Sequence, residues 1–174
     1  SGWSNSGNKP WYAQTDTVYE GSYALRSGKI TDAQESVLVL ERETGAGTGY
    51  FYVMASTEQD WDALEFLLNG RVLGKWSGRV NWTKFEFALE AGNNRLEWRY
   101  RKDSSTFAGM DAVFIDNVFI PELPVVEPPP ATKPTIVVAG VTAEGLQLTV
   151  TGDAATEYYV QFSTDLDAWS TLAK

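Results

Sequence analysis

A run of carboxylates between residues 58 and 65 has side chains of the type that could hydrolyse a glycosidic bond. The run reads Glu-Gln-Asp-Trp-Asp-Ala-Leu-Glu and includes Asp60, Asp62 and Glu65. Glycoside hydrolysis requires two carboxylates within reach of the same bond. In a regular strand Asp62 and Glu65 point to opposite faces, and only a bulge would bring them together. We therefore interpret the run as the solvated beginning of a strand.

The same run resembles, in part, the acidic strand motif of laminarinase-like glucanases. That motif begins with a nucleophilic Glu and ends with an acid/base Glu, whereas here Asp60 stands at the nucleophile position and the flanking pattern differs. A short motif of this kind matches many sequences by chance. A glycoside hydrolase or polysaccharide lyase domain is therefore the least favoured of the functions considered, and we expect no catalytic residues.

Several other chemistries are excluded because the sequence contains no Cys and no His. Disulfides, thiolate metal sites, histidine general bases and Ser-His triads are all ruled out. Zinc and copper lose their usual ligands. Carboxylate and carbonyl oxygens remain, and these suit hard cations such as calcium.

The overall composition limits the partners and the compartment. The chain has 174 residues, of which 43% are hydrophobic, and a net charge of -9. A nucleic-acid partner is not expected, because phosphate contacts need a basic stripe. No apolar run is long enough to span a bilayer, so membrane insertion is not expected. An acidic, cysteine-free, tryptophan-rich chain is typical of bacterial extracellular proteins, and we expect a secreted or cell-surface localisation.

Seven tryptophans supply the candidate ligand surface. Trp11 and Trp98 are expected in the core, because Trp98 alternates with other apolar residues. Trp61 lies among aspartates, and Trp76 lies in a Gly-Lys-Trp-Ser-Gly segment that we interpret as a turn. An indole left in water often stacks on a sugar ring. Trp61 and Trp76 are therefore predicted to bind glycan, and Trp82 fits either role.

Two alternatives remain open for these side chains and for the charged residues beside them. Each loop tryptophan could instead fold back over a sheet edge, since Trp is highly buried on average. The charged residues on neighbouring predicted strands form either a solvated face or a polar platform for sugar hydroxyls, with Arg99 and Arg101 as ligand-binding candidates. The charged set comprises Lys84, Glu86, Glu97, Arg99, Arg101 and Lys102.

The first 121 residues are dominated by strand patterns. Alternating or continuous apolar runs occur at 35–42, 48–56, 62–69, 81–89, 95–102 and 111–120. Turn signals separate them, and Asn69-Gly70 is the strongest hairpin signal. No long helix is predicted. Short strands at this spacing predict an all-β fold, an antiparallel β-sandwich of the jelly-roll type.

The remainder of the chain differs in texture. Residues 122–134 are rich in proline and are predicted to form a semi-rigid linker. Residues 135–174 carry three strand signals, too few for an independent sandwich, which needs about seven strands. We interpret them as a partial segment resembling an immunoglobulin or fibronectin type III domain. Alternatively, these strands pack onto the first domain as an extra layer.

Several segments of the first region together resemble jelly-roll modules of bacterial secreted and surface proteins. These modules are related to MAM domains, cleaved-adhesin domains and carbohydrate-binding modules. The resemblance implies a non-catalytic glycan-binding or adhesion module within a larger protein, with a polysaccharide or glycan as its partner. The alternative is a structural or protein–protein interaction module without a sugar site. The segments are 11–14, 19–28, 55–58, 62–66, 77–78, 98–103 and 111–118.

The resemblance also implies a structural calcium ion, held near the paired first and last strands of such modules. The matching positions are Asp116 and, with less support, Asp16 or Glu20, with Asp111 as a further candidate ligand. Asp116 lies within an apolar run, where an ionised carboxylate must be paired or bound to metal. The alternative is that Asp116 accepts backbone N–H groups or pairs with an arginine such as Arg26.

Overall fold

The computed structural model describes residues 2–124, 133–143, 145–153 and 157–173. The chain divides into two compact units, Ser1–Val125 and Val126–Lys174, and each is treated by itself. Most of the predicted linker at 122–134 lies outside the described residues. No helix within the described ranges has the length and hydropathy needed to cross a membrane.

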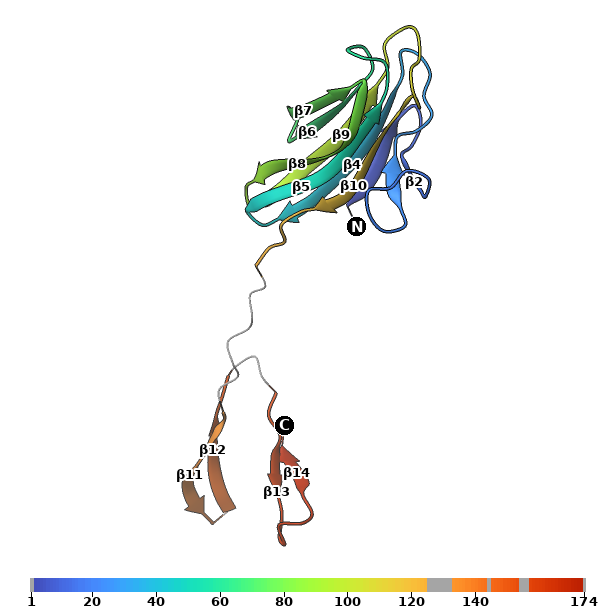
Figure 1. The fold of residues 1–174 in the computed structure, drawn as a ribbon. Helices are drawn as coiled ribbons and strands as arrows, with labels where there is room; N and C mark the ends of the chain where they lie inside the picture. The colour runs from blue at the N-terminus through green and yellow to red at the C-terminus, as the bar shows by residue number, and fades with distance from the viewer. Residues whose placement is uncertain (1, 125–132, 144, 154–156, 174) are drawn as a thin grey trace. The chain divides into compact units, whose positions relative to one another are not determined.

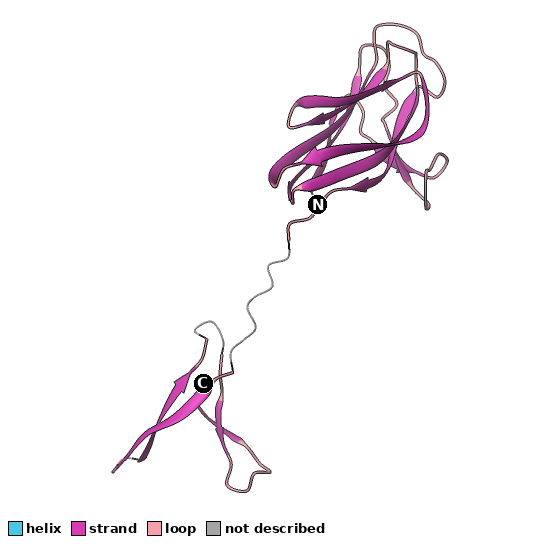
Figure 2. Ribbon diagram, turned by 60° about the vertical axis from the view of Figure 1, so that its left-hand side comes forward, coloured by secondary structure: helices cyan, strands magenta, loops and turns pink. Residues whose placement is uncertain are grey.

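Ten strands of the first unit form two five-stranded antiparallel sheets that pack face to face (Figures 1 and 2). The predicted all-β sandwich is confirmed. The first sheet has the order β1 (Trp3–Gly7), β4 (Glu35–Thr44), β9 (Gly92–Arg101), β6 (Ala63–Leu68) and β7 (Arg71–Ser77). The second has the order β2 (Tyr12–Gln14), β3 (Ala24–Arg26), β10 (Ala112–Phe119), β5 (Gly47–Ser56) and β8 (Arg79–Leu89).

The core lies between the two sheets and consists of alternate residues of the central strands. Trp98 of β9 is fully buried, and its ring centroid lies 5.5 Å from that of Phe51 on the opposite sheet. Phe66 of β6 lies 5.2 Å from Trp98, centroid to centroid. Trp11 is also buried, and its indole N–H donates to the Ser36 carbonyl. Both tryptophans expected in the core are therefore found there.

The hairpin between β6 and β7 is formed by the predicted Asn69-Gly70 turn. Asn69 has a φ of 51° and Gly70 a φ of 82°, the pair of positive angles that a type I′ turn requires. The segment 74–78, however, is not a turn, because β7 continues to Ser77. Gly74 is needed for packing instead, since a Cβ there would overlap the indole of Trp76.

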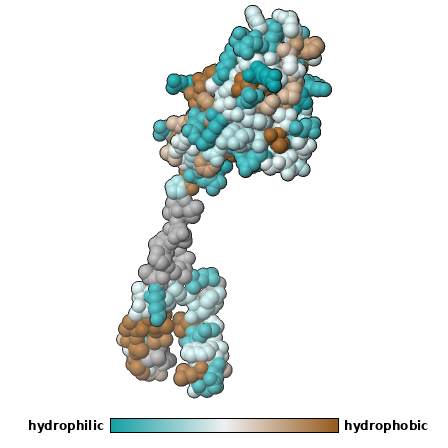
Figure 3. Space-filling view, in the orientation of Figure 1, coloured by the Kyte–Doolittle hydropathy of each residue, from teal (hydrophilic) through white to brown (hydrophobic). Residues whose placement is uncertain are grey.

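The second unit contains four described strands in two separate antiparallel pairs. Many of its apolar side chains are exposed, including Val141 at 78% and Trp169 at 55%, and Figure 3 shows apolar surface gathered on this unit. The resemblance of this unit to a fibronectin type III segment stays a prediction. The strands are β11 (Thr135–Thr142) with β12 (Gly145–Thr151), and β13 (Val160–Phe162) with β14 (Ser170–Ala173).

Candidate functional site

An open depression of about 220 Å³ lies at one end of the first sheet, and we call it the Trp61 pocket. Trp61 precedes β6, and its side chain is 66% exposed. An apolar ring held so far into water at the wall of a charged depression is available to stack on a ligand. The residues that line the pocket include Trp61, Glu65, Lys75, Arg101, Lys102 and Asp103.

The floor of the pocket is organised by one carboxylate, that of Glu65 on β6. Arg99 Nη2 donates to Glu65 Oε2 at 3.0 Å, and Arg101 Nη1 lies 3.9 Å from the same oxygen. Lys75 lies opposite Glu65 in the register of β6 and β7. The predicted ligand-binding residue Arg101 therefore lies in the pocket with Trp61, and Arg99 is connected to it through Glu65.

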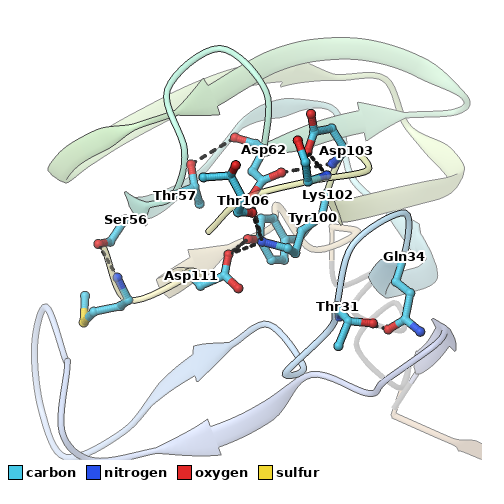
Figure 4. A network of polar contacts seen from close by, with 12 residues as sticks. Thr31, Gln34, Ser56, Thr57, Asp62, Tyr100, Lys102, Asp103, Thr106 and Asp111 are labelled. Carbon is cyan, nitrogen blue, oxygen red and sulfur yellow. Dashed lines mark hydrogen bonds and ion pairs between the residues drawn. The ribbon is translucent and has the colours of Figure 1, made fainter. Parts of the chain in front are cut away.

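Beneath the pocket, Lys102 donates all three of its ammonium hydrogens within the protein (Figure 4). Its Nζ lies 2.8 Å from Asp62 Oδ2, 2.5 Å from Asp111 Oδ1 and 3.3 Å from the Thr106 carbonyl oxygen. The Lys102 and Asp62 side chains are 1% and 0% exposed. Burial lowers the pKa of Lys102, but hydrogen bonds to Asp111 and Asp62 outweigh burial and raise it. Lys102 is therefore a charged internal cation.

This arrangement joins two loops that form walls of the pocket. One precedes β6 and carries Trp61, and the other follows β9 and carries Asp103. Asp62 Oδ1 also accepts the backbone N–H of Asp103 at 3.0 Å. Asp111 accepts the Tyr100 hydroxyl at 3.0 Å, and burial followed by the Asp111 charge raises the pKa of Tyr100. The Lys102 network therefore fixes both walls.

Both interpretations of the charged strand face, a solvated face and a polar platform, placed Lys102 at the surface, and this was wrong, because its side chain is buried. Lys102 has the same parity along β9 as Trp98 and Tyr100, both of which face the core. Asp62 has the parity of Leu64, also a core residue. A lysine and an aspartate on the core-facing side of neighbouring strands was the signal that could have revealed the pair.

Asp62 and Glu65 do lie on opposite faces, as the regular alternation of the strand predicts. Asp62 is buried against Lys102, whereas Glu65 pairs with Arg99 on the outer face of the sheet. Each carboxylate is therefore held by its own cation. The two do not share one site, as a pair acting on a glycosidic bond would.

Three carboxylates beside the Lys102 network could hold a metal ion. Oxygens of Glu58, Asp62 and Asp103 lie within 4.8 Å of one another. Burial, followed by repulsion from Asp103 and Asp62, raises the pKa of Glu58. Among the described residues, these three are the acidic side chains that lie close enough together to hold an ion. None of the four ligands predicted from the sequence belongs to this group.

The carboxylate of Asp116 is occupied by backbone N–H groups. Its Oδ2 accepts the N–H of Tyr19 at 2.9 Å and of Glu20 at 3.2 Å, and its Oδ1 accepts that of Asn117 at 2.7 Å. These are the contacts that the hydrogen-bonding alternative for Asp116 describes. Arg26 instead donates to the Tyr12 hydroxyl and the Met110 carbonyl.

Of the other predicted ligands, Glu20 lies beside Asp116, and Asp111 and Asp16 have other contacts. Asp111 belongs to the Lys102 network. The Glu20 carboxylate accepts the side-chain amide of Asn117 at 2.7 Å. Asp16 is exposed, and its backbone N–H donates to Gln14.

Neither Trp76 nor Trp82 lines the Trp61 pocket. Trp76 is half-buried against the core, with its ring centroid 5.0 Å from that of Phe85, so its expected exposure in a turn is wrong. Trp82 packs edge-on against Phe114 on the outer face of the second sheet. Trp61 is the candidate indole that the Trp61 pocket brings together with Arg101.

No protein-family model matches the sequence, and no curated protein sequence matches it. Solved structures with the same fold do exist, at low sequence identity. The secreted serine protease VesC from Vibrio cholerae matches with a TM-score of 0.52 and 18% identity over 68% of this chain, but only 24% of VesC is covered.

Two smaller neighbours are covered almost completely. TmCBM61, solved with β-1,4-galactotriose, has a TM-score of 0.51 and 17% identity over 71% of this chain and 90% of its own. The K2 cleaved adhesin domain of Lys-gingipain has a TM-score of 0.53 and 13% identity over 69% of this chain and 88% of its own. The chain thus contains the β-sandwich fold of carbohydrate-binding and cleaved-adhesin modules.

Proposed function

We propose that the first unit is a non-catalytic glycan-binding module and that Trp61 is its principal contact. The observation that carries the proposal is the 66% exposed indole of Trp61 at the wall of a charged pocket. The apolar C–H face of a sugar ring packs on an indole, while neighbouring charged groups bind its hydroxyls. The Lys102 network supports such a role, because a site held rigid loses less entropy on binding.

The fold comparison supports the same class of function. TmCBM61 was solved with a bound β-1,4-galactotriose, and it has the same sandwich fold. A fold alone does not fix function, so the Trp61 pocket has to carry the argument. A structural or protein–protein interaction module is the second candidate. The exposed apolar strands of the second unit favour it, because such surface is typical of protein contacts.

We also propose that the protein is secreted or displayed on a bacterial surface as part of a larger protein with further domains. VesC is described as secreted, and the part of it that this chain matches is 24% of its length. The composition points the same way, since the chain is acidic and has no Cys.

The calcium proposal moves from Asp116 to the group of Glu58, Asp62 and Asp103. Carboxylate oxygens are the ligands that calcium prefers. Asp62 is already neutralised by Lys102, so Glu58 and Asp103 would supply most of the charge. Calcium should raise the melting temperature of the wild type, and this gain should vanish in Glu58→Gln. Equal melting curves in calcium and in chelator would rule out the ion.

Affinity electrophoresis across a panel of polysaccharides tests the binding function. At least one glycan should retard the wild type, and Trp61→Ala should remove the retardation without lowering the melting temperature. Tyr23→Ala is the matched control, because Tyr23 is 65% exposed but does not line the pocket. Binding that survives Trp61→Ala would contradict the site, and release of reducing ends would contradict the non-catalytic role.

A further inference from the structure

The Trp61 pocket contains more cationic side chains than its carboxylates can pair with. Glu65 is flanked by Lys75 on β7 and by Arg99 on β9, each directly opposite it in the strand register. Arg101 approaches the same Glu65 oxygen from the end of β9. Three cations therefore surround one carboxylate on the outer face of the sheet.

The three cations differ in how closely they interact with Glu65 and in how exposed they are. Arg99 is only 26% exposed and makes the short contact with Glu65. Arg101 is 57% exposed, and its approach to Glu65 at 3.9 Å is too long for a hydrogen bond. Lys75 is exposed, and in the described part of the chain it makes no ion pair. Two cations thus have unused donors at the pocket, in a chain whose net charge is -9.

The acidic groups at the pocket leave these donors free. Asp103 lines the pocket, but its Oδ1 accepts the Ser105 N–H at 2.9 Å. Asp62 lies below, neutralised by Lys102. Among the described residues, Arg101 forms an ion pair with Glu65, at 3.9 Å, and Arg99 already holds that carboxylate.

We propose that the Trp61 pocket selects sugars that carry a carboxylate, as uronate residues do. The sugar ring stacks on Trp61, and the carboxylate binds the guanidinium of Arg101 and the ammonium of Lys75. A planar guanidinium matches a carboxylate in geometry as well as charge. This inference rests on the proposed glycan-binding function and adds the chemical class of ligand.

Polygalacturonate and its methyl ester are the decisive pair of probes, because they share a backbone and differ in charge. Microcalorimetry of the full chain should show binding to polygalacturonate at least about tenfold tighter than to the methyl ester, and binding should weaken as salt is added. Neutral β-1,4-galactan and a sulfated galactan complete the set. Tighter binding to the ester or to neutral galactan would overturn the inference, and so would binding to the sulfated glycan alone.

Charge-removing variants show whether the pocket is responsible. Arg101→Gln and Lys75→Gln should each weaken polygalacturonate binding by about tenfold and weaken binding to the methyl ester much less. Arg79→Gln is the control, because Arg79 is exposed on β8 and does not line the pocket. An equal loss in Arg79→Gln means diffuse attraction and overturns the inference. If only a neutral glycan binds, and its binding depends on Trp61, the proposed glycan-binding function stands and the uronate inference fails. If no glycan binds, the proposed function and the uronate inference both fail.

Discussion

The ammonium of Lys102 lies 2.8 Å from the carboxylate of Asp62, and neither side chain meets solvent. Removing one partner of a buried ion pair leaves an uncompensated charge and costs about 3–5 kcal/mol. Lys102→Met should therefore lower the free energy of unfolding by about that amount, measured by urea denaturation.

Two further variants make this measurement specific. Lys75→Met removes an exposed lysine and should change the free energy of unfolding by less than about 0.5 kcal/mol. Asp62→Leu combined with Lys102→Met removes both fully buried charges and should recover part of the loss, because the remaining partner of Lys102, Asp111, is 26% exposed. An unchanged urea midpoint in Lys102→Met would show that solvent reaches the pair.

Glu58 gives the fold a pH dependence whose sign follows from its environment. Burial and repulsion from Asp103 and Asp62 raise the pKa of Glu58 in the folded protein. The folded state then holds the Glu58 proton more tightly than the unfolded state does. The contribution of Glu58 to stability is therefore fully present below the ordinary Glu pKa of about 4.3 and is lost as pH rises through the raised value.

The substitution Glu58→Gln tests this pH dependence, because glutamine has a similar shape and no charge. At neutral pH and in chelator, Glu58→Gln should melt at a higher temperature than the wild type. The difference should shrink as pH falls below about 4.3, since the wild-type carboxyl is then protonated as well. A variant that melts lower than the wild type at neutral pH would show that the charged form of Glu58 has a favourable partner.

The tryptophans offer a direct contrast between packing and exposure. Trp76 packs against Phe51 and Phe85, with ring centroids 5.8 and 5.0 Å away. Trp76→Ala should cost about 3 kcal/mol of unfolding free energy, whereas Trp61→Ala should stay within about 0.5 kcal/mol. Guanidinium denaturation followed by circular dichroism measures both. Equal costs would mean that Trp61 has packing contacts comparable with those of Trp76.

The central strands could be predicted because their apolar residues alternate. In β9, Leu96, Trp98 and Tyr100 face the core while the charged residues between them point outward, and the structure confirms this pattern. The short strands β1, β2 and β3 have three to five residues each and no such pattern. β1 and β3 are held by pairing to the longer strands β4 and β10, and β2 is held by pairing to β3, which a local pattern does not reveal.

The site was predictable only in part, for similar reasons. Trp61 stood out because its immediate neighbours are both aspartates. The predicted exposure of Trp76 was wrong because Gly74 and Gly78 suggested a turn, whereas Gly74 makes room for the Trp76 indole. Lys75 was missed, since its place in the pocket depends on the register that pairs it with Glu65. Register is a property of the assembled sheet and cannot be read from β7 alone.

Asp116 anchors the loop between β2 and β3 to the outer face of the second sheet. Its carboxylate accepts the N–H groups of Tyr19 and Glu20, and the Tyr19 ring stacks on Tyr52 at 3.8 Å between centroids. Asp116→Ala leaves both N–H groups without this acceptor and should cost about 1–3 kcal/mol. Amide hydrogen exchange at Tyr19 and Glu20 should accelerate, because their protecting acceptor is gone.

The outcome also separates hydrogen bonding from metal binding at Asp116. The loss in Asp116→Ala should be equal in calcium and in chelator, because the three contacts of the carboxylate are all backbone N–H groups. Asp16→Ala is the control and should change neither stability nor exchange, since the Asp16 side chain is exposed. A loss seen only in calcium would show that Asp116 binds the ion after all, and the Tyr19 loop would then owe its position to metal.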